Sequence, residues 1–238
     1  MLRLTAPTAP TIMTGYSEQF DVLFIHVPKT AGSSMEQAEF VSGQGHRPYW
    51  ALEEEVRDKA GFSFGFVRNP YDRFVSIVTE GMYTVMRKNG ELPANDEGRE
   101  QLFERTKQLV TYATATGDQD GPLELGSTTR WRVLGKETDP LPHLEGWAYP
   151  IHFVPQHFFL SKPGMTEIGV DMVGRFENLQ DDWQKICDRL AVKSTMPHLR
   201  NVQADRGHTS ADFYTPESKA VVRKLYARDF EVFGYDVE

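Results

Sequence analysis

The sequence predicts an α/β fold in which a central, mostly parallel sheet is flanked by helices. Two short apolar segments, DVLFIHV at residues 21–27 and FSFGFV at residues 62–67, have the composition of buried strands. Each is followed by residues of helical composition, and strands that alternate with helices are typical of a parallel sheet. A length of 238 residues fits one such domain.

We expect a flexible N-terminal tail at residues 1–18 and a single domain at residues 19–238. The first residues are rich in Thr, Ala and Pro, and they lack the basic flank and apolar core of a signal peptide. Residues 116–150 have many Gly, Pro and Thr but little periodicity, which predicts an irregular insertion.

Periodicity and composition place the other elements. Helices are expected at residues 33–41, 51–60, 71–87, 99–115, 180–190 and 217–230, and further strands at residues 158–160 and 172–176. Pro70 stands where the third helix begins, a position that tolerates proline well. Residues 88–98 are polar and are expected to form a loop.

Bulk properties exclude several classes of partner. The formal net charge of −8 repels polyanions, which argues against nucleic acid as a ligand. No apolar run approaches the roughly 20 residues of a membrane-spanning helix. The single cysteine, Cys187, excludes an intrachain disulfide and suits a reducing compartment, so we expect a cytoplasmic protein. No Cys/His cluster has metal-ligand spacing, and no metal is expected.

The segment HVPKTAGSS at residues 26–34 has the properties of an anion-binding loop. It joins a strand to a helix, whose first N–H groups are unpaired and favour an anion. Lys29 adds a charge, Thr30, Ser33 and Ser34 add hydroxyl groups, and Gly32 allows a close approach of the backbone. The lysine comes before the glycine, unlike a Walker A loop. The alternative is an ordinary strand–turn–helix with a capping serine.

A second anion site is predicted in FVRNPYDRFVSIV at residues 66–78. Arg68 ends a strand, and its planar fork suits phosphate. Ser76 lies about two helical turns beyond Pro70. Arg73 is expected on the helix surface or in a structural ion pair. Two anion sites on neighbouring strand–helix units match a nucleotide that carries phosphate groups at its 5′ and 3′ positions.

These motifs resemble those of a known family. HVPKTAGSS resembles the 5′-phosphosulfate loop of the Golgi-type carbohydrate sulfotransferases and their bacterial relatives, and FVRNPYDRFVS resembles their 3′-phosphate motif, although that family often has Asp in place of Asn69. Further matches follow in the family's order: HFVPQ (152–156), GRFENL (174–179), Asn201 and YARDFEVFGY (226–235). The resemblance implies a P-loop NTPase-like sulfotransferase fold.

The resemblance also implies an enzyme that moves a sulfuryl group from PAPS (3′-phosphoadenosine-5′-phosphosulfate) to an acceptor hydroxyl. The acceptor would be a carbohydrate or a small metabolite, with PAP as the product and no metal required. Lys29 would contact the bridging oxygen, while the 5′-phosphate would be wrapped by Thr30, Ala31, Gly32, Ser33 and Ser34. Arg68 and Ser76 would bind the 3′-phosphate, and Arg206 would reach it from a polar loop. The insertion at residues 116–150 would lie near the acceptor.

A general base is expected among the histidines. Heparan sulfate 2-O- and 6-O-sulfotransferases place a catalytic histidine between their two PAPS motifs, and His46 lies at a similar point here. The alternative is a loop histidine that packs or caps. Other candidate bases are His26, His152, His208, Glu36 and Glu39. Contacts with the acceptor are expected from Arg47, His152 and Gln156.

Two other functions stay open on the sequence alone. The first is a nucleotide-dependent phosphotransferase, which the missing Walker A pattern and the lack of an obvious Mg²⁺-binding aspartate argue against. The second is a protein that binds PAP or another nucleotide without catalysis.

Overall fold

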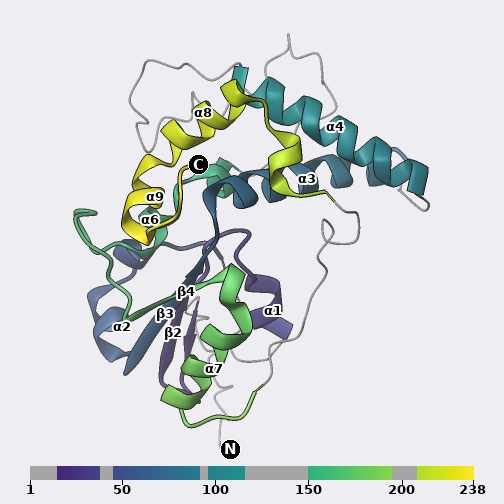
Figure 1. Cartoon of the computed structure of the whole chain (residues 1–238). Coiled ribbons are helices and arrows are strands. Elements are labelled where there is room, and N and C mark those ends of the chain that lie inside the picture. Colours follow the sequence, from purple (N-terminus) through teal and green to yellow (C-terminus); the bar gives the residue numbers. More distant parts are fainter. Residues whose placement is uncertain (1–14, 38–44, 92–95, 116–149, 195–207) are drawn as a thin grey trace, which may run out of the picture.

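The computed structural model describes residues 15–37, 45–91, 96–115, 150–194 and 208–238 (Figure 1). Its centre is a four-stranded sheet in the order β1 (Tyr16–Ser17), β2 (Val22–Ile25), β3 (Phe62–Val67) and β4 (Met172–Arg175). Strands β2, β3 and β4 are parallel, and β1 pairs antiparallel with β2 at the edge. The α/β class with a mostly parallel sheet is confirmed. The edge strand lies inside the segment where a flexible tail was expected.

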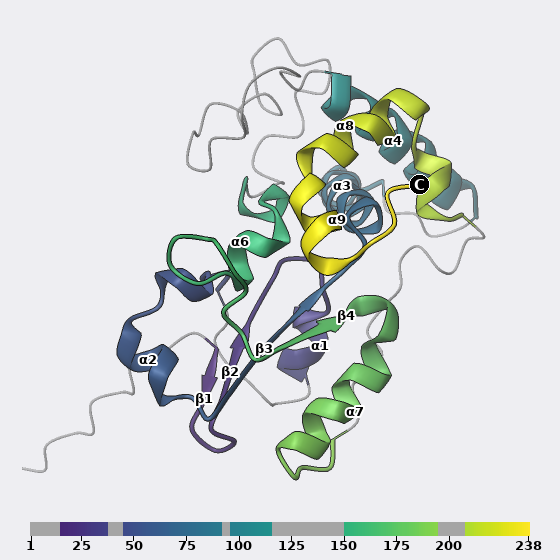
Figure 2. The same ribbon diagram turned by 60° about the vertical axis from the view of Figure 1, so that its left-hand side comes forward.

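Alternate residues of each strand point to opposite faces of the sheet, and both faces are buried. Val22 and Phe24 contribute to one apolar cluster with Met35 of α1 (Gly32–Gln37) and Trp183 of α7 (Leu179–Arg189). On the opposite face, Leu23 and Ile25 belong to a cluster that includes α2 (Glu54–Lys59) and α6 (Gln156–Leu160). Figure 2 shows α1 and α7 on one side of the sheet and α2 and α6 on the other.

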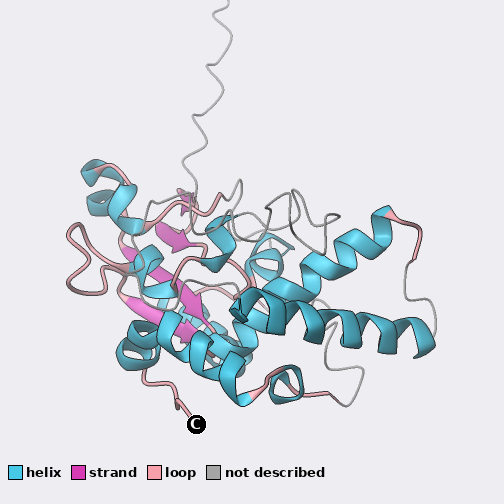
Figure 3. Ribbon diagram, turned by 90° about the horizontal axis from the view of Figure 1, so that it is seen from above, coloured by secondary structure: helices cyan, strands magenta, loops and turns pink. Residues whose placement is uncertain are grey.

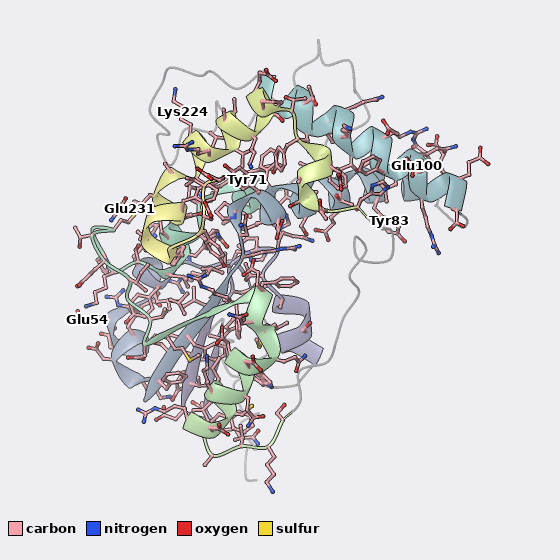
Figure 4. All side chains as sticks on the ribbon, viewed as in Figure 1. Glu54, Tyr71, Tyr83, Glu100, Lys224 and Glu231 are labelled. Atoms are coloured by element: carbon pink, nitrogen blue, oxygen red, sulfur yellow. The ribbon has the colours of Figure 1, made fainter. Side chains whose placement is uncertain are left out.

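A layer of helices lies beyond the carboxyl ends of the parallel strands (Figures 1 and 3). It contains α3 (Pro70–Lys88), α4 (Asp96–Ala115), α8 (Pro216–Leu225) and the short 3₁₀ helix Ser210–Phe213, which share one apolar cluster. Tyr71 of α3 (Figure 4) donates its hydroxyl to the Val237 carbonyl at 3.0 Å, so the C-terminal segment is bound to this layer.

The expectation of a strand at residues 158–160 was wrong, because these residues belong to α6. The carboxylate of Asp229 accepts hydrogen bonds from the backbone N–H groups of Gln156 at 2.7 Å and His157 at 2.9 Å. These are N–H groups of the first turn, which have no partner inside a helix. A side chain 73 residues away therefore stabilises a helix that the local sequence does not indicate.

The single helix expected at residues 217–230 is two helices, α8 and α9 (Ala227–Phe233), with Tyr226 between them. The Tyr226 hydroxyl donates to the Phe153 carbonyl at 2.8 Å, which fixes the break in the core. Short 3₁₀ helices occupy Tyr49–Ala51, Pro150–Phe153 and Phe176–Asn178. Helix α4 begins at Asp96, inside the expected loop. The predicted insertion, apart from its last residue, lies outside the described residues. Among the described residues, no helix has the length and apolar character required to cross a bilayer.

Candidate active site

The candidate site lies where the three parallel strands end. Because β2, β3 and β4 are parallel, the residues that follow Ile25, Val67 and Arg175 meet at one edge of the sheet. Open α/β sheets bind ligands at this edge. The loop of HVPKTAGSS follows β2, Arg68 follows β3 and Glu177 follows β4.

The loop after β2 has a backbone shape that suits an anion. Lys29 has φ of 69° and Ala31 has φ of 79°, a left-handed conformation that is uncommon for residues other than glycine. Thr30 lies between them, is fully buried, and donates its hydroxyl to the Val27 carbonyl at 2.8 Å. Among the described residues, no backbone acceptor meets the N–H groups of residues 29–32. Such a bend with unpaired N–H groups forms a concave anion site.

Gly32 is required at its position by a neighbour within the protein. A Cβ atom there would lie 1.7 Å from Nε2 of His26, so the imidazole ring of His26 packs directly against this glycine. Ser34 is buried, and its N–H donates to the Ala31 carbonyl at 2.9 Å. The side chain of Ser33 lies outside the described part of the structure.

Arg68 has a cationic side chain whose hydrogen-bonding capacity is not used within the described residues. Its Nε atom is buried and makes no hydrogen bond there. The guanidinium carbon lies 4.3 Å from the centre of the Phe176 ring. Burial lowers the pKa of Arg68, although the negative charges of Asp72 and Glu177 oppose that shift. An arginine stays charged under such shifts, so the site favours an anionic ligand.

Two side chains hold the backbone around Arg68. The Gln156 amide accepts the Arg68 N–H at 2.8 Å and donates to the Arg68 carbonyl at 2.8 Å. Glu177 accepts the N–H of Asn69 at 2.6 Å and the hydroxyl of Tyr235 at 2.9 Å. Gln156 is fully buried, so the structure places it behind Arg68 and not at an open surface.

Arg73 connects helix α3 to two other parts of the site. It is almost completely buried and donates to three carbonyls, those of Pro28 at 3.0 Å, His152 at 2.7 Å and Val154 at 3.0 Å. It therefore lies neither on the helix surface nor in an ion pair with any described residue. Ser76, one turn further along α3, is partly buried.

Three histidines that are far apart in the sequence lie together beside the loop. The ring centres of His26 and His46 are 4.4 Å apart, and those of His46 and His152 are 5.2 Å apart. Burial, and then the charge of His46, lower the pKa of His26 to about 3 and that of His152 to about 4. Both rings are therefore neutral at pH 7.

The position of His46 defines which of its nitrogens carries the proton. Nδ1 of His46 lies 3.2 Å from the backbone carbonyl oxygen of His26. A carbonyl oxygen only accepts hydrogen bonds, so this contact requires a proton on Nδ1. In neutral His46, Nε2 then carries no proton, which is the protonation state that a general base needs.

These features agree with the comparison with known proteins. A model of the sulfotransferase family matches residues 14–236 of this chain. The chain belongs to the sulfotransferase family. A search of curated proteins and a search of solved structures found no significant match.

The other residues predicted for the site of this sulfotransferase make other contacts or lie outside the described residues. Arg47 is exposed and donates to the Ala51 carbonyl at 2.7 Å and to Glu53 at 2.9 Å. His208 stacks on Phe103 of α4, with ring centres 3.7 Å apart. Arg206, Asn201 and Glu39, and the side chain of Glu36, lie outside the described part of the structure.

Sequence reasoning missed one charged residue of this sulfotransferase that meets the loop. Glu80 of α3 forms an ion pair with Lys29, with Oε2 and Nζ 2.5 Å apart. Its spacing is a usable signal, because Arg73, Ser76 and Glu80 are three and four residues apart and share one face of the helix. If Arg73 faces the loop, Glu80 on the same face of the helix must also lie near the loop.

Proposed function

We propose that this sulfotransferase transfers a sulfuryl group from PAPS to an acceptor hydroxyl and releases PAP. The observation that carries the proposal is the buried Nε of Arg68 at the end of β3, which no described residue bonds, next to the left-handed loop of Lys29 at the end of β2. Two anion sites on adjacent strands suit a nucleotide with two separated anionic groups. The loop after β2 would then be a P-loop-like phosphate site.

The described residues fit such a donor. The backbone of residues 29–34 would surround the 5′-phosphosulfate, with Lys29 close to the bridging oxygen. Arg68 and Ser76 would bind the 3′-phosphate, since a guanidinium with unused donors forms strong charge-assisted bonds to phosphate. Gln156 and Glu177 would act indirectly, because they fix the backbone on either side of Arg68.

Catalysis would depend on two groups on opposite sides of the transferred sulfur. When bound, PAPS supplies the sulfuryl group and a leaving phosphate. Lys29 would stabilise the negative charge that grows on that phosphate as the bridging bond breaks. Nε2 of His46 would take the proton of the acceptor hydroxyl as its oxygen bonds to sulfur. The His26 carbonyl would keep the proton of His46 on Nδ1.

His46 is preferred to His152 as the base on two grounds. Its Nδ1 is anchored to a backbone carbonyl, which orients the ring. The pKa of His152 is lowered to about 4, mainly by burial, and a base with so low a pKa is a weak proton acceptor at neutral pH. Arg47 and His152 would instead contact the acceptor.

The acceptor would be a carbohydrate or a small metabolite that is neutral or cationic. The chain carries a formal net charge of −8, and two of the described cations of this region are already paired, Lys29 with Glu80 and Arg47 with Glu53. A polyanionic acceptor would meet repulsion and few unpaired partners.

The test combines a binding measurement with a transfer assay. Calorimetry should detect PAP binding to the wild type and a loss of about 10–100-fold for Arg68→Ala, the equivalent of about 1.5–3 kcal/mol for a charge-assisted contact. Lys224→Ala on the exposed face of α8 is the matched control, and it should bind PAP as the wild type does. Labelled PAPS with a panel of hydroxyl acceptors should give a sulfated product by mass spectrometry. Phosphorylation of an acceptor with ATP and Mg²⁺, but no sulfation, would support a phosphotransferase instead.

A further inference from the structure

Lys29 carries the positive charge that the 5′ group of the donor would need, and Glu80 already forms an ion pair with it. Nζ of Lys29 and Oε2 of Glu80 are 2.5 Å apart. The Lys29 side chain is 21 % exposed and that of Glu80 is 54 % exposed, so an incoming ligand can reach both groups. The pair therefore lies at the mouth of the loop and not in the core.

Both partners of this pair are held by fixed backbone. The left-handed conformation of Lys29 sets the direction in which its side chain leaves the loop. Arg73 bonds the carbonyl of Pro28, the residue before Lys29, to helix α3 at 3.0 Å. Glu80 lies on the same face of α3, two turns after Arg73. The ion pair is thus a consequence of how α3 packs against the loop.

We propose that Glu80 is a positioning residue that holds the Lys29 ammonium in the donor-free enzyme and gives it up to the 5′-phosphosulfate when the donor binds. This exchange rests on the proposed function, because it requires a donor with an anionic 5′ group. An ammonium group has three hydrogens but a single charge, and Glu80 already partly neutralises it. The donor must compete with Glu80, and its apparent affinity is reduced accordingly.

The experiment measures affinity for two nucleotides that differ only at the group facing Lys29. PAP has a 5′-phosphate, whereas adenosine 3′-monophosphate has none. At low ionic strength, Glu80→Gln should bind PAP about two- to fivefold more tightly than the wild type, the range expected when a partly exposed ion pair no longer competes. Its affinity for adenosine 3′-monophosphate should be unchanged. The gain should shrink in high salt, which screens exposed charges.

Two further variants sharpen the measurement. Glu80→Ala also removes the amide oxygen that Gln would still offer to Lys29, and it should bind PAP at least as tightly as Glu80→Gln. Glu54→Gln, at an exposed residue of α2 (Figure 4), changes the net charge by the same amount and should leave both affinities at wild-type values. A merely structural role of Glu80 would change the affinities for both nucleotides together.

Each other outcome has a defined meaning. Equal PAP affinity in the wild type and Glu80→Gln would overturn the exchange and leave the proposed function intact. Weaker PAP binding by Glu80→Gln would also overturn it, because Glu80 would then prepare Lys29 for the donor without competing. A wild type that binds no PAP would overturn the proposed function, and the exchange with it.

Discussion

The Arg73 guanidinium donates from Nε to the carbonyl oxygen of Pro28, 3.0 Å away, and so joins helix α3 to the loop that carries Lys29. The same guanidinium donates to the carbonyls of His152 and Val154. Burial lowers the pKa of Arg73, and the nearby Tyr226 and Asp229 oppose that shift. One buried cation thus sets the relative positions of the loop, α3 and a candidate histidine.

Replacement of Arg73 should destabilise the protein and weaken donor binding together. Arg73→Met fills similar space but leaves one buried and two partly buried carbonyls without their donor, which should cost about 2–4 kcal/mol of unfolding free energy. Urea denaturation would measure the change, and Lys224→Met on the exposed surface of α8 should have little effect. A variant as stable as the wild type would show that these three contacts carry little energy.

Loss of Lys29 should reduce turnover more than it reduces PAP affinity. Lys29→Ala removes a charge whose contact strengthens as the leaving phosphate becomes negative, so the effect belongs to the transition state. We expect turnover to fall by about 10²–10³-fold, as for other groups that stabilise a developing anion, while PAP affinity changes much less. The two quantities come from initial rates and calorimetry. Normal turnover with weakened binding would reduce Lys29 to a docking residue.

His46→Asn should lower the rate of transfer by about 10²–10⁴-fold, because the amide cannot take the acceptor proton. PAP affinity should stay close to that of the wild type. The wild-type rate should rise with pH as one imidazole loses its proton, since only the neutral ring is a base. His152→Asn is the matched comparison. If it is inactive while His46→Asn retains activity, the base is His152.

His26 should make the protein sensitive to acid. Its pKa is lowered from 6.5 to about 3 in the folded state, so the unfolded chain binds the proton more tightly. The contribution of neutral His26 is complete above pH 6.5 and is lost as the pH falls toward 3. Between pH 6.5 and pH 5, the unfolding free energy should fall by about 2 kcal/mol from this group.

Urea denaturation at several pH values would measure this loss. His26→Asn does not titrate in this range, and its stability should depend less on pH even if it is lower throughout. His152 shifts in the same direction and should leave part of the slope in the variant. A slope equal to that of the wild type would show that His26 is not held neutral by the fold.

The sequence predicted best those features that depend on neighbouring residues. Residues 62–67 form β3 as expected, and Arg68 follows it at the edge where the anion site was predicted. The apolar composition of residues 62–67 indicates directly that both faces of this strand are buried. The loop after β2 could also be located, since its small residues and its lysine are local signals.

The errors concern elements that depend on distant contacts. Helix α6 is capped by Asp229, and the sequence near residues 156–160 does not indicate that contact. Lys29 and Glu80 are 51 residues apart, and only the packing of α3 brings them together. The buried position of Arg73 follows from three carbonyls on other segments, which no pattern around residue 73 reveals.

The cap that Asp229 places on helix α6 has a consequence for synthesis of the chain. Asp229 holds the backbone of Gln156, and Gln156 in turn holds the backbone of Arg68. During translation, residue 68 leaves the ribosome long before α9 is made. The side chains that hold its backbone, Gln156 and through it Asp229, are therefore added late. If the proposed donor site is correct, the nascent chain should acquire affinity for PAP only after α9 has emerged, and PAP binding would distinguish chains that contain α9 from chains stalled before it.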